Sequence, residues 1–254
     1  MPAAPSSTLA SAPILLALDT ATDRLHIALS VPAQQRVFAQ VLPGGPQASA
    51  GLLPALQGLL TDAGLDWSDV NAIAFGAGPG AFTGLRTACS VTQGLALGLG
   101  VPVIVLDTLM AVAEDARQRA SESLAPGTEV WVLQDARMGE LYVGAFTWDG
   151  AHWTPQVAPA LWPLSEPRAR WAGRGQAVRV CGNALSACPS AWDGLAAADT
   201  QVLAPEAAPA GAALLALAAQ AWSRGEQVDP ALALPRYVRD KVAQTTAERA
   251  AAQA

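Results

Sequence analysis

Two aspartates in this sequence stand where a carboxylate could hold a metal-bound phosphate. Asp19 follows the apolar run Ile14 to Leu18 and begins the turn Asp19-Thr-Ala-Thr22, and Asp135 follows a second apolar run and begins the turn Asp135-Ala-Arg-Met-Gly139. Carboxylate oxygens are hard ligands for Mg²⁺, so two of them facing each other could hold a nucleotide. Aspartates in turns also cap backbone N–H groups without any ligand.

The first turn favours the capping interpretation. A turn that wraps a phosphate with its backbone needs glycine at the point where the anion approaches, and Ala21 stands at that point here. The Cβ of alanine narrows both the backbone angles and the space for an anion. A vestigial nucleotide site, if one is retained, would use Asp19, Thr20, Thr22, Gly78, Gly80, Asp135 and Gly139.

A glycine-rich loop, Gly76-Ala-Gly-Pro-Gly-Ala-Phe-Thr-Gly-Leu-Arg86, lies between a strand-like run and a helix-like run. Such a loop suits a phosphate at the start of the helix, or a closely packed neighbour. It is not a Walker A loop, because the Gly-Lys-Ser/Thr ending is missing, and Ala81 replaces the third glycine of a Rossmann fingerprint. The pattern favours packing or an interface over phosphate binding.

Composition limits the classes of function. Hydrophobic residues make up 52% of the 254 residues, which is enough to bury a large core, and the net charge of −6 argues against binding nucleic acid without a partner. Three cysteines without Cys-x-x-Cys spacing and two histidines indicate neither a disulfide framework nor a metal centre. We therefore expect a cytoplasmic protein without a cofactor or membrane anchor, preceded by a disordered tail over residues 1–12.

The order of predicted elements repeats along the chain. Three strands, a helix, a strand, a helix and a strand are expected between Ile14 and Leu106, and Thr108 is expected to cap a helix that runs through Ala120. Strands from Val130, Leu141 and Trp153 begin a second copy. This α/β layout, with duplicated halves, is typical of the two-domain actin/hexokinase-like (RNase H-like) fold. The predicted domains are residues 13–107 and 108–224, followed by a tail over residues 225–254.

Two predicted helices could form an interface. The helix from about Ser49 to Gly64 carries a leucine stripe, and the helix over residues 85–99 has a face of small residues with Gly94 and Gly98 four apart. Interior glycines cost about 1 kcal/mol each relative to alanine, so close packing must offset them. The pattern alone does not decide between packing on this chain's own sheet and packing on a second chain.

Four segments together resemble the TsaB (YeaZ) family, the dimerization subunits of the bacterial complex that makes threonylcarbamoyladenosine in tRNA. They are Ile14 to Thr22, the glycine loop with its helix, Asp135-Ala-Arg-Met-Gly-Glu-Leu-Tyr142, and Pro235-Arg-Tyr-Val-Arg239. The resemblance covers the chain from about Pro13 to Arg239. Ala48 stands where many members of the family carry histidine, so no role of that histidine is transferred.

The resemblance implies a chain that has the actin-like fold without its catalytic and metal-binding residues. It implies pairing with a TsaD-like subunit, which transfers threonylcarbamoyl to adenosine 37 of ANN-reading tRNAs, and docking of a TsaE-like ATPase on the pair. The tRNA would be bound only through the complex. The heterodimer interface would consist of Leu52, Leu53, Leu56, Leu60, Ala88, Thr92 and Leu95. Without its partner, the chain is expected to form a homodimer.

Two other hypotheses remain open at this point. A self-sufficient actin-fold ATPase or sugar kinase would use Asp19, Asp135 and the glycine loop, and would hydrolyse nucleotide in a Mg²⁺-dependent way. A metallopeptidase would need a ligand pattern that this sequence does not supply.

Overall fold

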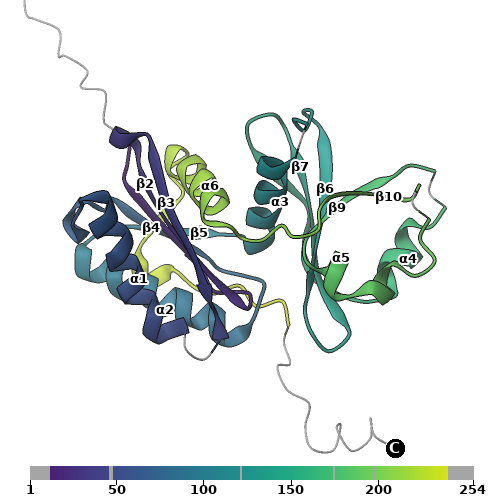
Figure 1. Ribbon diagram of the computed structural model, residues 1–254, viewed down its shortest axis with the longest axis horizontal. Coiled ribbons are helices and arrows are strands. Elements are labelled where there is room, and N and C mark those ends of the chain that lie inside the picture. Colours follow the sequence, from purple (N-terminus) through teal and green to yellow (C-terminus); the bar gives the residue numbers. More distant parts are fainter. Residues whose placement is uncertain (1–11, 46–47, 121, 174, 197, 240–254) are drawn as a thin grey trace, which may run out of the picture.

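The computed structural model describes residues 12–45, 48–120, 122–173, 175–196 and 198–239. It has two β-sheets that face each other across a layer of two helices, with further helices on the outer side of each sheet (Figure 1). The predicted disordered tail over residues 1–12 lies outside the described residues, except for its last residue, and so does the chain beyond Arg239.

The first sheet has the strand order β11-β5-β4-β1-β2-β3. A three-stranded antiparallel meander, β1 to β3, begins it, and β4 and β5 add parallel strands beside β1. All five residues of β1 are buried, because helices cover both faces of the sheet at its centre. The elements are β1 (Leu15–Asp19), β2 (Arg24–Val31), β3 (Arg36–Pro43), α1 (Ala48–Ala63), β4 (Ala72–Gly76), α2 (Phe82–Leu99) and β5 (Val103–Leu106).

The second sheet repeats this topology, with the order β10-β9-β6-β7-β8. Here β6 to β8 form the meander, and β9 and β10 are the added parallel strands. The matching orders confirm the predicted α/β fold with duplicated halves. The elements are β6 (Thr128–Asp135), β7 (Glu140–Trp148), β8 (Trp153–Pro163), α4 (Glu166–Trp171), β9 (Val178–Cys181), α5 (Ala184–Ala187) and β10 (Thr200–Ala204).

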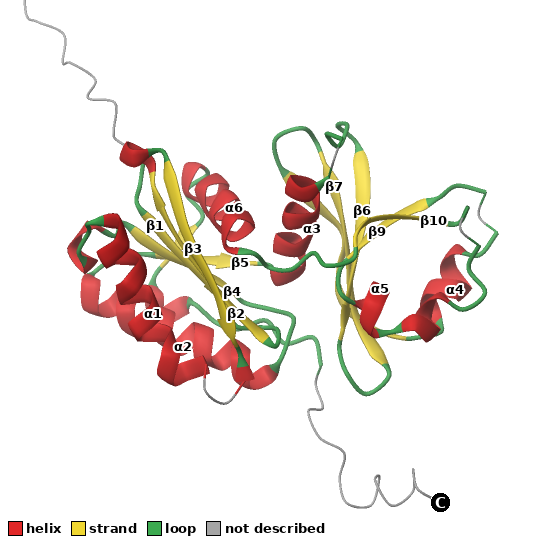
Figure 2. Cartoon of the chain, viewed as in Figure 1, coloured by secondary structure: helices red, strands yellow, loops and turns green. Residues whose placement is uncertain are grey.

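The two helices of the middle layer pack on opposite sheets. α3 (Thr108–Arg119) lies against β6 and β7 of the second sheet, whereas α6 (Gly211–Ser223) lies against β1 and β2 of the first sheet (Figure 2). We therefore call the first sheet with α1, α2 and α6 the first lobe, and the second sheet with α3, α4 and α5 the second lobe. The predicted second domain, residues 108–224, had included α6 because the helix follows the second set of strands in sequence. The predicted boundary near residue 107 stays a prediction.

The chain after α6 returns to the first lobe. β11 (Gln227–Val228) pairs antiparallel with β5, and Gln93 Nε2 on α2 donates hydrogen bonds to the carbonyl oxygens of Pro230 and Ala233, each at 3.1 Å. In its described part, residues 225–239, the segment predicted to be a tail is therefore part of the fold. Short 3₁₀ turns span Pro32–Gln34, Trp67–Asp69, Pro189–Trp192 and Pro230–Leu232.

Local details differ from the sequence prediction at a few points. α2 begins at Phe82 rather than Leu85, and α3 is capped by Asp107, whose Oδ1 accepts hydrogen bonds from the backbone N–H groups of Leu109 and Met110. The prediction had assigned this cap to Thr108. β10 was not predicted, because its residues alternate too weakly in polarity to indicate a strand.

His26, on β2, is a buried base without a hydrogen-bond partner. Its side chain is 5% exposed, and neither ring nitrogen has a partner among the residues that the structure describes. The pKa of this imidazole is lowered from 6.5 to about 4, chiefly by burial; the charges of Arg24 and Arg119 also lower it, and that of Asp23 opposes the change. The folded chain therefore holds His26 neutral at neutral pH.

Replacing His26 by leucine is expected to stabilise the fold by about 1 to 3 kcal/mol at pH 7, because the substitution removes an unsatisfied buried polar group. In the unfolded chain His26 binds a proton as the pH falls below 6.5, whereas in the folded chain it does so only near pH 4. Between pH 6.5 and pH 4 the unfolded chain therefore binds more protons, and the stability of the wild-type fold decreases as the pH falls. The gain should therefore be larger at pH 5 than at pH 7.5 in urea unfolding. Equal gains at both pH values would contradict this assignment, and His152→Leu, where the side chain is 46% exposed, is the control.

Candidate functional site

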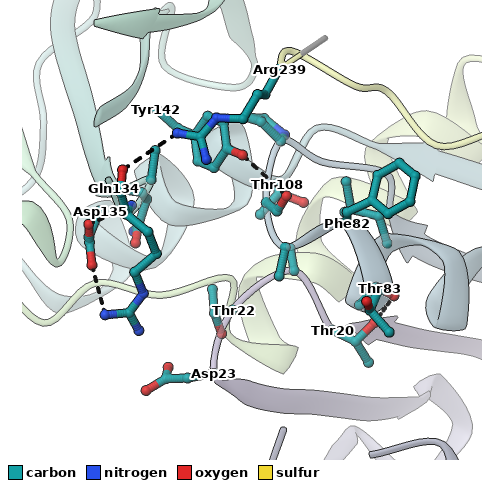
Figure 3. Close-up of a pocket in the computed structure, with 18 of the residues that line it drawn as sticks. Thr20, Thr22, Asp23, Phe82, Thr83, Thr108, Gln134, Asp135, Tyr142 and Arg239 are labelled. Atoms are coloured by element: carbon teal, nitrogen blue, oxygen red, sulfur yellow. Dashed lines mark hydrogen bonds and ion pairs between the residues drawn. The ribbon is translucent and has the colours of Figure 1, made fainter. Parts of the chain in front are cut away.

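A cleft of about 630 Å³ lies between the two lobes. The turn after β1, the glycine loop and the first turn of α2 line it from the first lobe, and the end of β6 with the turn after it lines it from the second lobe. Figure 3 shows Thr20, Phe82 and Thr83 on one side of the cleft and Gln134, Asp135 and Tyr142 on the other. Thr108 and the C-terminal residues Tyr237, Val238 and Arg239 complete its lining.

Asp19 lies outside this cleft and is fully buried. Its Oδ1 accepts a hydrogen bond from the backbone N–H of Ala21 at 2.7 Å, and its Oδ2 accepts one from the Thr108 hydroxyl at 2.8 Å. Burial raises the pKa of this carboxyl from 3.8 to about 6, although both hydrogen bonds oppose the rise. Asp19 thus ties the turn after β1 to the start of α3, which is a structural role.

Asp135 lies on the wall of the cleft, where it supports a left-handed turn. Its Oδ1 accepts a hydrogen bond from the Arg137 backbone N–H at 2.8 Å, and its Oδ2 pairs with Arg137 Nη1 at 3.1 Å. Arg137 and Met138 have φ values of 61° and 57°, which are uncommon for residues other than glycine, and Gly139 follows with 74°. The two aspartates therefore have different roles: Asp19 is buried and joins two segments of the fold, whereas Asp135 lies on the cleft wall and stabilises its own turn.

The glycine loop packs against the turn after β1. A Cβ on Gly80 would lie 2.5 Å from the Cβ of Ala21, and a Cβ on Gly84 would lie 1.9 Å from the carbonyl oxygen of Thr20. The Thr20 hydroxyl donates a hydrogen bond to the Gly84 carbonyl at 2.6 Å. These glycines are thus required because the loop approaches the backbone of the turn after β1 closely, which agrees with the packing interpretation.

Part of the predicted vestigial nucleotide site lines the cleft. Thr20, Thr22, Gly80 and Asp135 do so, whereas Asp19, Gly78 and Gly139 do not. Gly78 has a φ of 115°, and its backbone N–H is bonded to the Thr108 hydroxyl at 3.1 Å. Phe82, Thr83, Tyr237 and Val238 also line the cleft; they lie within motifs that the sequence analysis named but were assigned to no site. It missed Gln134 and Asn183, which belong to none of those motifs.

Most of the predicted interface residues point into the core of the first lobe. Leu52, Leu56 and Leu60 on α1, with Ala88 and Thr92 on α2, have no exposed surface at all. A fully buried side chain cannot contact a second chain, so these five assignments are corrected. Of the other two, Leu53 is 46% exposed and Leu95 is partly buried. The leucine stripe of α1 covers β2 and β3 of the chain's own sheet.

The outward face of α1 and α2 combines glycines with exposed leucines. A Cβ added at Gly51, Gly58, Gly94 or Gly98 would meet no atom within 4 Å. Leu97, beside them on α2, is 62% exposed. Within the residues that the structure describes, no close packing offsets the conformational entropy that these helical glycines lose, so the face has the character of a surface where another backbone approaches closely.

Two further features of the described residues concern metal binding and membrane spans. The described residues hold no group of three or more histidine, cysteine, aspartate or glutamate side chains placed to share a metal ion. Among the helices that the structure describes, none combines the length and apolar character needed to cross a bilayer.

Comparisons with known proteins give one consistent result. Residues 46–167 match the family model described as TsaD, tRNA N6-adenosine threonylcarbamoyltransferase. The chain is 32% identical over 237 residues to the tRNA threonylcarbamoyladenosine biosynthesis protein TsaB of Escherichia coli, covering 90% of this chain and 96% of that protein. The crystal structure of YeaZ from Pseudomonas aeruginosa superposes with a TM-score of 0.72 at 32% identity, covering 89% of this chain and 99% of that one. A second Pseudomonas aeruginosa structure, described as similar to the peptidase YeaZ, gives a TM-score of 0.75, also at 32% identity, with 89% and 100% covered.

Proposed function

The chain belongs to the TsaB family, and from this premise we propose that it is a non-catalytic partner subunit in the synthesis of threonylcarbamoyladenosine at position 37 of ANN-reading tRNAs. In this proposal it binds and supports a TsaD-like catalytic subunit in the cytoplasm, and a TsaE-like ATPase docks on the pair. The tRNA is bound only through the complex, which agrees with the net charge of −6.

The environment of Asp19 is the observation that supports a non-catalytic role most directly. A carboxylate that binds Mg²⁺ must present free lone pairs to the ion. Both oxygens of Asp19 already accept hydrogen bonds from this chain, and the side chain has no exposed surface. A Cβ at Gly76 would come within 1.7 Å of Asp19 Oδ2, so the β4 backbone closes over this carboxylate. The self-sufficient ATPase would need this group in the cleft.

The outward face of α1 and α2 supports the position of the partner surface. Helical glycines whose missing Cβ would meet no atom of the described chain within 4 Å let a second helix backbone approach closely. Leu53 and Leu97 add apolar area that an isolated chain leaves in water. The proposed interface therefore uses Gly51, Leu53, Gly94, Leu97 and Gly98 in place of the buried residues of the same helices.

Co-elution with the TsaD-like protein of the same organism tests this function. Wild type is expected to form a stable complex, and Leu97→Asp is expected to lose it, because a charge would be buried against an apolar partner surface. Val202→Asp, a matched substitution at a 51% exposed site on β10 of the other lobe, should bind like wild type. The mass of each variant alone tests the predicted homodimer, which Leu97→Asp should convert to a monomer.

Two outcomes would contradict the proposal. If wild type elutes apart from the TsaD-like protein, the partner assignment fails. If the isolated chain hydrolyses ATP and Asp19→Ala abolishes that activity, the ATPase hypothesis replaces the partner role.

A further inference from the structure

A C-terminal segment, residues 235–239, crosses from one lobe to the other beside the cleft. We call it the strap. Its beginning is fixed to the first lobe: the Arg236 backbone N–H donates a hydrogen bond to the Ala77 carbonyl at 2.7 Å. The Tyr237 ring packs on Phe82 with ring centroids 4.9 Å apart, and its hydroxyl accepts a hydrogen bond from Arg86 Nε at 3.1 Å.

The end of the strap is fixed to the second lobe through Arg239. Its guanidinium donates to Glu140 Oε2 at the start of β7, and to the Arg137 carbonyl at 3.5 Å in the left-handed turn. The Arg239 side chain is 14% exposed, so this ion pair is shielded more than an ordinary surface pair. Arg239 thereby also contacts the turn in which Arg137 and Met138 hold positive φ values.

The other connections between the lobes differ in kind. The chain itself crosses between β5 and α3, and again between β10 and α6, and Thr108 is hydrogen bonded to both Asp19 and Gly78 beside the first crossing. The helices α3 and α6 of the middle layer also pack against each other, and Gln220 on α6 donates a hydrogen bond to the Ala151 carbonyl at 3.1 Å. At the cleft, the described side chains add one longer hydrogen bond, from the Tyr142 hydroxyl to the Gly80 carbonyl at 3.3 Å. Arg239 adds an ion pair, through which the strap holds the second lobe at the cleft.

We propose that the strap is a latch: the contact of Arg239 with Glu140 holds the two lobes closed around the cleft, and breaking that contact lets them move apart about the two chain crossings. Tyr237, Val238 and Arg239 line the cleft themselves, so release of the strap also changes access to it. This inference concerns the chain alone and does not depend on the proposed partner.

Distances between spin labels on the two lobes test the latch in the full chain. Ser68→Cys on the first lobe and Ser186→Cys on α5 of the second lobe are both exposed and do not contact the strap. The native cysteines, Cys89, Cys181 and Cys188, are buried, and a chain without the added cysteines controls for their labelling. Dilution with unlabelled chain removes distances between copies.

Wild type is expected to give one narrow distance distribution, and Arg239→Ala and Glu140→Gln are expected to give longer and broader ones. The charge exchange Arg239→Glu with Glu140→Arg should restore a narrow distribution. Arg236→Ala is the matched control, because its exposed side chain makes no hydrogen bond or ion pair within the described chain, and it should match wild type.

High salt provides a test without any substitution in the strap. In 1 M NaCl the wild-type distribution should shift towards that of Glu140→Gln, because salt screens the partly exposed pair. Unfolding midpoints measured for each variant separate loss of the latch from loss of the fold. If folded Arg239→Ala and Glu140→Gln give the wild-type distribution, and salt has no effect, the latch is refuted.

Discussion

Gly84→Ala is expected to destabilise this protein by about 3 kcal/mol or more, although alanine is ordinarily the better helix former. Gly84 lies in the first turn of α2, and a Cβ there would lie 1.9 Å from the carbonyl oxygen of Thr20. The obstacle is backbone at the turn after β1, so no side chain can rotate to relieve the overlap. The Thr20 hydroxyl also loses its 2.6 Å hydrogen bond to the Gly84 carbonyl if the two segments separate.

Gly94→Ala is the matched control, because it makes the same substitution in the same helix. Its Cβ would meet no atom within 4 Å, so the isolated chain should gain about 0.5 to 1 kcal/mol from helix propensity. Urea unfolding of both variants gives the comparison directly. If the two substitutions change stability in the same direction, the close contact between the glycine loop and the turn after β1 is not maintained in solution.

Glu114→Ala is expected to destabilise the fold by about 2 to 4 kcal/mol, because it breaks the hydrogen bonds and ion pair of a buried carboxylate and leaves the buried indole N–H of Trp153 without its acceptor. Glu114 is 1% exposed on α3 and accepts two hydrogen bonds from Arg117, each at 2.8 Å. It also accepts hydrogen bonds from the indole N–H of Trp153 at 2.9 Å and from the Gln118 amide at 2.8 Å. Trp153 is itself buried, so water would not replace Glu114 as the acceptor for its indole N–H.

The loss from Glu114→Ala should depend on pH. Burial raises the pKa of the Glu114 carboxyl, but its hydrogen bonds from Arg117, Trp153 and Gln118 lower it by more, so the pKa lies below the ordinary 4.5. The ionised group thus stabilises the folded chain above about pH 4.5, and this contribution disappears as the pH falls through the folded pKa. The difference between wild type and variant should be full at pH 7 and shrink towards pH 3.

Glu166→Ala provides the comparison for a surface ion pair. Glu166 pairs with Arg170 one helical turn away at 2.7 Å, but the Arg170 side chain is 52% exposed. Its removal should cost about 1 kcal/mol or less. A loss from Glu114→Ala as small as that from Glu166→Ala, measured by thermal or urea unfolding, would show that the buried network on α3 is not maintained.

Much of the fold could be predicted because it depends on short-range patterns. Apolar runs that end in turn residues located β1 and β6, and leucine spacing located α1 within one or two residues of its observed bounds. The repeat of meander, helix and strand was visible in the order of these elements, and the sheets confirm it. The weakest region of the prediction was residues 159–205, where α4, α5 and β10 are short and lack clear periodicity.

The candidate site was predicted less well, because its residues become a site only when distant segments meet. The sequence marked Asp19 as a turn aspartate, but Thr108, its partner in the fold, lies 89 residues away. The glycine loop was correctly interpreted as packing, yet the atoms it packs against, in Thr20 and Ala21, were not identified. Arg239 was noted only as part of a C-terminal motif, and its pairing with Glu140, 99 residues away, is something that no local pattern could indicate.

Most of the secondary structure, the duplicated layout and the family to which the chain belongs followed from the amino-acid sequence, because periodicity, turn residues and motif spacing are local properties. Which face of each helix is buried followed from the tertiary structure. The leucines of α1 fit a partner chain or the chain's own sheet equally well by pattern, and burial against β2 and β3 settles which they use. The same holds for α6: its alanine-rich sequence is compatible with packing on either sheet, and the structure shows that it packs on the first. Hydrophobic burial has no direction of its own, so the partner of an apolar face is fixed by topology and not by composition.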